Sequence, residues 1–332
     1  MMIIQHHTAS VLSIVLALLA VITLVCAQDN DADLTVTKGS GIEDLHPSSD
    51  SVQPTIFDLL EINGASTVAK LLKTSSELKD VRDLLALPSS TLTFFAPNDH
   101  AMETLPEMEY QTTFKYLTLL KPMTLVEMSN ESTNILNTSL TGSKEPLRGR
   151  NGSTMGFVLA IAKQGQDHVL WSSSPQSPGR FVHGDIKASN GILHIIDKAI
   201  TAPMSAEWVL QNTPDLSEFY KVSRNLNLTS ESLYGKTLFA VSNSAMLQFP
   251  SETWSSPQQV LAIQSHMIAG TYYSNNLTTS KIIDPNTKAS LSIAKLTDND
   301  ININDAKVLV KDILTANGKV SDTRVFTLFT ID

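Results

Sequence analysis

Two stretches of ten residues decide how this chain is organised: Thr93-Phe-Phe-Ala-Pro-Asn-Asp-His-Ala-Met102 and Thr237-Leu-Phe-Ala-Val-Ser-Asn-Ser-Ala-Met246. Five of the ten positions are identical, at an offset of 144 residues. A second shared pattern, D-I-x-x-x-N-G, begins at Asp185 and again at Asp312, at an offset of 127. Because the two matches keep their order, one duplicated domain explains both, with extra residues in the first copy. We place the first copy at residues 53–203 and the second copy at 204–332.

The repeated motifs also predict local structure. Thr-Phe-Phe-Ala is typical of a buried strand, and the polar residues after it turn the chain and cap a helix that carries Ala-Met. Apolar residues at spacings of three and four between Thr55 and Leu85 predict helices. Asn190-Gly191 separates two β-rich runs and predicts a turn between strands, because Asn-Gly readily takes positive φ. In the second copy, the apolar residues over 301–310 predict one incoming strand.

The N-terminus has the features of a secretory signal. Residues Val11 to Val25 are almost uninterruptedly small or apolar, and fifteen helical residues span only about 22 Å of a hydrocarbon core of about 30 Å. Small residues then precede polar Gln28, a pattern that favours cleavage between Ala27 and Gln28. Residues 1–27 would then be a signal peptide. A retained signal-anchor is the alternative. Residues 28–52 are polar and acidic, which indicates a flexible segment.

Cysteine usage and glycosylation motifs agree with export. The one cysteine, Cys26, lies inside the predicted signal, so the mature chain has no disulfide and no Cys-based metal site. Five N-x-[ST] sequons predict glycosylated, exposed loops. Their asparagines are Asn130, Asn137, Asn151, Asn227 and Asn276. The alternative is chance occurrence in a chain rich in Asn, Ser and Thr.

Composition and motifs argue against several classes of function. The net charge is −9 and no Lys/Arg cluster stands out, which argues against a nucleic-acid partner. The patterns G-x-S-x-G and H-E-x-x-H are absent. Asp298-Asn-Asp300-Ile-Asn302 opens like a calcium loop but lacks its later Gly and Glu, which favours a strand entered from a polar turn. The histidines are scattered. We therefore expect no catalytic residues, cofactor or metal.

The two copies resemble fasciclin domains. The motifs at 93–102 and 237–246 are similar to the first conserved segment of that family, and DIKASNGILHIIDKAITAP at 185–203 is similar to the second. SHMIAGTYYSNNL at 265–277 resembles the middle segment. The second copy ends in NGKVSDTRVFTLFTID where N-G-x-x-H-x-I-D is usual. The resemblance covers nearly all of 53–332 and implies an α+β fold, with each copy a twisted β-wedge or sandwich with helices packed on one side.

Four residues occupy motif positions of the family, and the resemblance implies structural roles for them. They are Asn190, Gly191, His194 and His266. We expect each of the two histidines to be held by a buried hydrogen bond.

The resemblance also implies a candidate partner-binding motif. In this family an Asp-Ile pair ahead of the last hairpin has been proposed as a contact for cell-surface receptors. Asp312-Ile313 is similar to that pair, and Asp185-Ile186 is its counterpart in the first copy. The alternative interpretation is structural, because an Ile in a strand is usually core and an Asp before a turn is usually a turn acceptor.

The leading hypothesis is a non-enzymatic adhesion protein that is secreted or held at the cell surface. Its partners would be extracellular matrix or cell-surface proteins, glycans or cell-wall polysaccharide, bound through surface loops. One alternative is a luminal scaffold of an endomembrane compartment, tethered by a retained N-terminal helix. Another is a hydrolase of wall polymers, which needs paired carboxylates that no spacing in the sequence indicates.

Overall fold

The computed structural model describes ten stretches of the chain: residues 53–128, 132–141, 147–148, 154–155, 157–224, 236–248, 255–283, 290–297, 299–317 and 324–331. The predicted signal peptide, its cleavage site at Ala27 and Gln28, and nearly all of the acidic segment lie outside them. Within the described stretches, no helix combines the length and the apolar character that crossing a membrane requires.

The first copy begins with helices and continues into a sheet. Its helical segments are α2 (Ile56–Leu59), η1 (Glu61–Asn63), α3 (Ser66–Thr74), α4 (Lys79–Ala86), α5 (Asp99–Met102), η2 (Glu107–Glu109), α6 (Tyr110–Tyr116) and α7 (Leu125–Met128). Its strands are β1 (Leu92–Pro97), β2 (Thr118–Leu119), β3 (Asn134–Asn137), β4 (Leu147–Arg148), β5 (Thr154–Met155), β6 (Val158–Gln164), β7 (Asp167–Trp171), β8 (Gly179–Ala188) and β9 (Gly191–Ile196).

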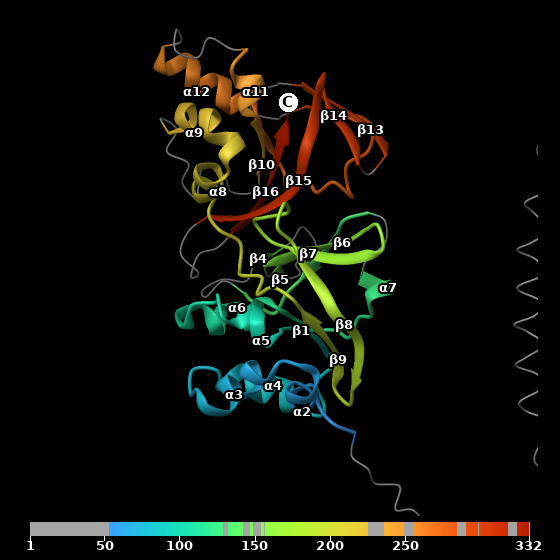
Figure 1. Ribbon diagram of the computed structural model, residues 1–332. Helices are drawn as coiled ribbons and strands as arrows, with labels where there is room; N and C mark the ends of the chain where they lie inside the picture. The colour runs from blue at the N-terminus through green and yellow to red at the C-terminus, as the bar shows by residue number, and fades with distance from the viewer. Residues whose placement is uncertain are drawn as a thin grey trace, which may run out of the picture. The chain divides into compact units, whose positions relative to one another are not determined.

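The second copy repeats this plan. Its helical segments are α8 (Ala206–Asn212), η3 (Pro214–Leu216), α9 (Ser217–Ser223), α11 (Asn243–Met246) and α12 (Ser256–Ser265). Its strands are β10 (Lys236–Val241), β11 (Met267–Ala269), β12 (Ser280–Ile283), β13 (Ser290–Thr297), β14 (Asp300–Ile303), β15 (Ala306–Asn317) and β16 (Arg324–Ile331). In Figure 1, α8, α9, α11 and α12 gather on one side of the second sheet.

The two sheets have the same topology, which confirms the α+β prediction and the duplication. The first has the strand order β2-β1-β9-β8-β7-β6-β3, and the second has β11-β10-β16-β15-β14-β13-β12. In both, the strand of the repeated ten-residue motif pairs in parallel with the last strand of its copy. This central strand is buried along nearly its whole length, as expected for a strand covered on both faces.

Each ten-residue motif begins with a threonine, and the hydrogen bonds of its hydroxyl explain why. The Thr93 hydroxyl donates to the carbonyl oxygen of Lys121 over 2.8 Å and accepts the amide of Met123 over 2.8 Å. In the second copy, the Thr237 hydroxyl makes the same pair of bonds with Gly270 and Tyr272, over 2.8 and 2.9 Å. Each threonine therefore fixes the chain just after the short neighbouring strand.

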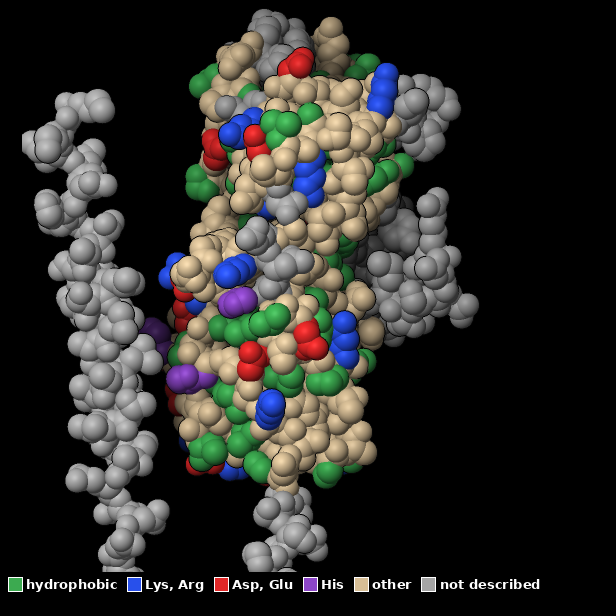
Figure 2. Space-filling model, turned by 90° about the vertical axis from the view of Figure 1, so that its right-hand side faces the viewer, with side chains coloured by type: hydrophobic (Ala, Val, Ile, Leu, Met, Phe, Trp, Pro, Cys, Tyr) green, Lys and Arg blue, Asp and Glu red, His purple; other side chains and the backbone are tan. Residues whose placement is uncertain are grey.

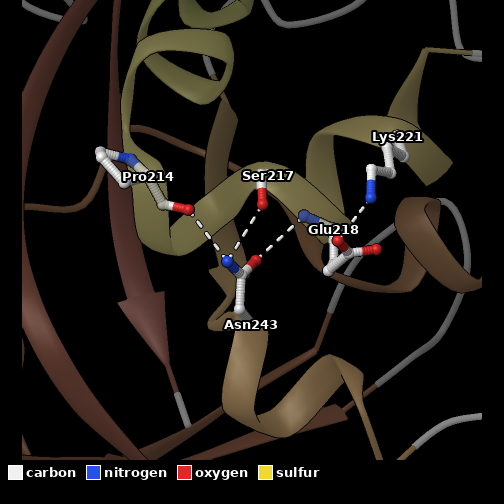
Figure 3. A network of polar contacts seen from close by, with 5 residues as sticks. All are labelled: Pro214, Ser217, Glu218, Lys221 and Asn243. Atoms are coloured by element: carbon white, nitrogen blue, oxygen red, sulfur yellow. Dashed lines mark hydrogen bonds and ion pairs between the residues drawn. The ribbon is translucent and has the colours of Figure 1, made fainter.

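In each copy, the polar residues after the motif strand cap two helices. Figure 3 shows the contacts of one of them, Asn243, with the start of α9. Ser242 caps α11 by accepting the Ala245 amide. The next residue, Asn243, accepts the Glu218 amide over 2.9 Å and donates to the Ser217 hydroxyl over 3.0 Å, at the start of α9. The first copy does the same with Asn98 and Asp99, whose carboxylate accepts bonds at the start of α3. Such caps satisfy amides that have no partner within their own helix.

The hairpin that contains Asn-Gly differs between the copies. In the first copy a turn joins β8 and β9 as predicted, but its two unpaired residues are Ser189 and Asn190, since Gly191 already pairs with Ala188. The positive φ expected of Asn190 is not observed. In the second copy, β15 pairs as far as Asn317, whose partner is Arg324. The paired ends of β15 and β16 are seven positions apart in the chain, so no two-residue turn joins these strands. The strand register shows the same difference between the copies. Ile186 pairs with a residue seven positions onward, whereas the equivalent Ile313 pairs with one fifteen positions onward.

The single incoming strand predicted for residues 301–310 was wrong. The structure has two antiparallel strands there, β14 and β15, with Ile303 paired to Ala306. Asn304, between them, takes a positive φ of 55°, and its side chain accepts the Ser292 amide. The alternation of apolar residues indicated strand correctly, but the left-handed Asn supplies a turn that the pattern alone did not show.

Candidate interaction site

The D-I-x-x-x-N-G pattern places an aspartate in an unusual backbone conformation in both copies. Asp185 has φ 58° and Asp312 has φ 55°, the left-handed region that favours glycine. In each copy the register of the strand pair shifts at this point, between His183 and Ile186 in the first copy and between Val310 and Ile313 in the second. The two aspartates therefore mark equivalent β-bulges, which commonly redirect side chains in a sheet.

Both aspartates bind the segment that follows the short strand after the motif. The Asp185 carboxylate accepts the Leu125 amide over 2.8 Å, which holds the start of α7. The Asp312 carboxylate accepts the Ser274 amide over 2.8 Å and also the Ser274 hydroxyl. A carboxylate that accepts backbone and hydroxyl donors is a structural acceptor, so this duplicated residue has the same local role in both copies.

The environments of the two Asp-Ile pairs are nevertheless opposite. Asp185 is exposed and Ile186 is half-buried. Asp312 and Ile313 are 0% and 1% exposed. Burial raises the pKa of the Asp312 carboxyl, against the opposing effect of the bonds from Ser274. A buried pair offers no side chain to a partner, so of the two predicted binding pairs only Asp185-Ile186 reaches the surface.

Asp312 is buried where strand β15 meets the end of β7, a contact that we call the joint. The indole N–H of Trp171 donates to the Asp312 carbonyl oxygen over 3.0 Å, and the Ser173 hydroxyl donates to the Leu314 carbonyl oxygen over 2.7 Å. The Leu314 amide donates to the Ser172 carbonyl oxygen over 3.2 Å. The Leu314 side chain is fully buried in an apolar cluster with residues of β6 and β7, Trp171 among them.

The chain that connects the copies is also held at the joint. The Ala316 amide donates to the Met204 carbonyl oxygen over 2.7 Å, and the Met204 amide donates to the Ser173 hydroxyl over 2.8 Å. The joint covers the backbone of Asp312 and the side chain of Leu314, while Ile313 is buried in the second copy's own core. Sequence reasoning missed this because the two copies carry the same motif and only their packing differs.

An exposed surface surrounds the first bulge, and we call it the Asp185 face: Val126, Val182, His183 and Asp185. Val126 on α7 is 82% exposed and Val182 on β8 is 46% exposed, while His183 is exposed. The Leu125 side chain packs on Gly184, where a Cβ would lie only 2.4 Å from it. Figure 1 shows α7 beside β8. Val126 was not predicted, because nothing in the sequence places α7 against the bulge.

The four motif residues with predicted structural roles lie as follows. His194 is fully buried, stacks on Phe95, accepts the Asp185 amide at Nδ1 over 3.1 Å and faces the Met123 carbonyl oxygen at Nε2 over 3.0 Å. His266 is half-buried at the end of α12, with its Nδ1 2.8 Å from the Ala262 carbonyl oxygen. Asn190 and Gly191 lie beside β1. His194 thus links the bulge to the segment before α7.

We expect His194 to make the first copy sensitive to acid. Burial lowers the pKa of His194 below 6.5, so below that pH the unfolded chain binds more protons than the folded one. Stability should therefore be complete above pH 6.5 and fall on acidification. Urea unfolding at pH 7.5 and 5.5 tests this for wild type, His194→Gln and His100→Gln. His100 is a matched control because its side chain is 85% exposed. Equal pH sensitivity of wild type and His194→Gln would contradict the prediction.

Two of the five sequon asparagines lie in the described stretches. Asn137 and Asn276 are both exposed, as a glycan requires. Asn130, Asn151 and Asn227 lie outside them. Glycosylation itself stays a prediction.

Catalytic and metal-binding arrangements do not stand out among the described residues. No group of three His, Cys, Asp or Glu side chains in that part of the chain is placed to hold a metal ion. Asp300 and Asn302 of the calcium-like stretch belong to strand β14. Figure 2 shows a face on which Lys and Arg side chains alternate with Asp and Glu, without a basic stripe.

Comparison with known proteins defines the class of protein. The family model described as the fasciclin domain matches residues 63–202 and 214–321, well over half of the chain and one region in each copy. The chain therefore belongs to the fasciclin domain family. It is also similar to a solved structure, the FAS1 domain pair from the insect cell adhesion molecule Fasciclin I, with 15% identity and a TM-score of 0.34. That match covers 82% of this chain and 96% of the other. No curated protein sequence matches.

Fasciclin domains are known from cell adhesion proteins and are typically non-catalytic. They are typically extracellular or at the cell surface. The family thus supports an adhesion-type role for this chain.

Proposed function

We propose that this chain is a non-enzymatic adhesion protein, secreted or held at the cell surface, that binds an extracellular matrix or cell-surface protein through the Asp185 face. The observation that carries the proposal is the exposure of Val126, next to the residue that Asp185 binds, and of Val182, three residues before Asp185, near a bulge that the duplicate copy buries. Exposed apolar residues beside a charged one suit a protein partner, whose interfaces combine an apolar centre with a polar rim.

The rigidity of this face also supports the proposal. The Asp185 carboxylate holds the start of α7, and His194 beneath it accepts the Asp185 amide. A partner that binds such a surface loses little conformational entropy in ordering it. Glycans and cell-wall polysaccharide would bind the protein at other surfaces.

The test is an array of matrix and cell-surface proteins probed with wild type, Val126→Glu and Met108→Glu. Met108 is 90% exposed on η2 of the same copy and serves as the matched control. We expect Val126→Glu to weaken binding about tenfold or more, because a charge replaces an apolar contact, and Met108→Glu to leave it unchanged. Absence of wild-type binding, or equal loss in both variants, would overturn the proposal.

A further inference from the structure

A small pocket lies beside the joint, and we call it the Trp208 pocket: Trp171, Ser177, Lys198, Ile200, Met204 and Trp208 are among its lining residues. Its volume is about 120 Å³. It is well below the roughly 300–1,000 Å³ of a site for a drug-sized molecule. The pocket therefore suits one small ring or the end of a longer ligand.

Two indoles give the pocket an apolar surface. Trp208 on α8 is 43% exposed, and among the described large hydrophobic residues with exposed side chains it is the only aromatic one. Trp171 is buried and fixed by its bond to the Asp312 carbonyl oxygen. Ile200 and Met204 continue this surface. Exposed tryptophan is costly to leave in water and is typical of binding sites.

A lysine supplies the charge of the pocket. Among the described residues that line the pocket, Lys198 is the only charged one, and none carries a carboxylate. Its ammonium donates to the Ser177 carbonyl oxygen over 2.6 Å and to the Ser177 hydroxyl over 2.7 Å. An ammonium has three N–H donors, so one is left for a ligand. Burial lowers the pKa of Lys198, and the nearby Asp197 carboxylate partly opposes this shift.

Serine and threonine hydroxyls complete the lining. Ser174 and Thr201 lie with Ser177 in the pocket, and Ser174 and Ser177 are exposed. A hydroxyl both donates and accepts a hydrogen bond, so these groups match the hydroxyls of a sugar. The pocket thus combines an aromatic face, hydroxyls and one positive charge.

We propose that the Trp208 pocket binds one acidic sugar residue of a polysaccharide, a pyranose that carries a carboxylate or a sulfate. The C–H face of the ring packs on the Trp208 indole, and the anionic group accepts a bond from Lys198. The rest of the polysaccharide lies outside the pocket, which has room for a single ring. This deepens the proposed adhesion role but uses a different surface from the Asp185 face.

The test uses the full-length expressed protein and three trisaccharides: trigalacturonate, a sulfated galactotriose and neutral galactotriose. Isothermal titration calorimetry is measured for wild type, Trp208→Ala and Lys198→Gln. Lys163→Gln is the matched control for charge, since Lys163 is exposed on β6, and Leu261→Ala, on α12, is the control for loss of an exposed apolar side chain. Circular dichroism and the Tm check that each variant folds.

We expect wild type to bind at least one acidic trisaccharide, with the carboxylate and sulfate arms showing which anion is preferred. Trp208→Ala and Lys198→Gln should each weaken binding about tenfold, and neither control should change it. The proposal is overturned if wild type binds neither acidic trisaccharide. It is also overturned if both pocket variants bind with wild-type affinity, or if the neutral trisaccharide binds as tightly as the acidic ones. If Val126→Glu loses protein binding but keeps sugar binding, the Asp185 face and the Trp208 pocket are independent binding sites.

Discussion

Replacing Gly191 by alanine should abolish the stable fold of the first copy. Gly191 has φ 144°, and a Cβ added there would lie 1.9 Å from the Leu92 carbonyl oxygen. That oxygen belongs to the backbone of β1, which pairs in parallel with β9 at this residue. The central pair of the sheet would have to separate, because no side-chain rotation relieves a clash with backbone. We expect a loss of about 3 kcal/mol or more.

Gly165→Ala is the control for this substitution. Gly165 also has a positive φ, 64°, but a Cβ added there would meet no atom within 4 Å. Alanine there should cost only the backbone strain, about 1–2 kcal/mol. Thermal unfolding of both variants measures the difference. A Gly191→Ala protein with a Tm within about 3 °C of Gly165→Ala would show that β1 and β9 are not held as closely as described.

Replacing Asn190 by alanine should have the second-largest effect. The Asn190 side chain is buried, and its oxygen accepts the Ile56 amide over 2.8 Å. Its nitrogen donates to the carbonyl oxygens of Leu85 and Leu87 over 2.8 and 3.2 Å. Alanine would leave one amide and two carbonyls without these bonds. The Leu87 bond is only partly buried, so water can replace it. Two fully buried groups at about 1–3 kcal/mol each, with a smaller loss at Leu87, give an expected total of about 3–5 kcal/mol.

The control for Asn190 is an asparagine whose side chain makes one bond at the surface. Asn212 donates to the Trp208 carbonyl oxygen over 2.8 Å and is exposed. Asn212→Ala should cost less than about 1 kcal/mol. Urea unfolding of the two variants gives both values. Similar losses for both would mean that Asn190 does not tie α2 and the end of α4 to the hairpin.

The sequence predicted the fold well because the duplicated motifs carry local signals. The residues that cap α5 and α11, Asn98 and Ser242, bind amides three residues onward, and the turn at Ser189 and Asn190 joins strands that are adjacent in the chain. The site was less predictable. Asp185 and Asp312 share a motif, a positive φ and a local role, yet only contacts with distant residues decide which of them is exposed.

Val126 and Trp208 show the same limit. Each is an apolar residue in a short helix, and spacing alone does not tell a core residue from an exposed one. Val126 is exposed because Leu125, its neighbour, takes the inward position on Gly184. Trp208 is exposed while Ala206, Val209 and Leu210 fill the buried side of α8. In both helices, packing against residues distant in the sequence decides which apolar side chains are buried.

A pull that separates the two copies would act on the joint. The amide and the carbonyl of Met204 both make hydrogen bonds at the joint. The chain that connects the two copies is therefore held there on both sides of this residue. A pull that separates the copies must break several hydrogen bonds together and bring Leu314 and Trp171 into water. Ile313 would stay buried after such a separation, because its side chain belongs to the core of the second copy and not to the joint.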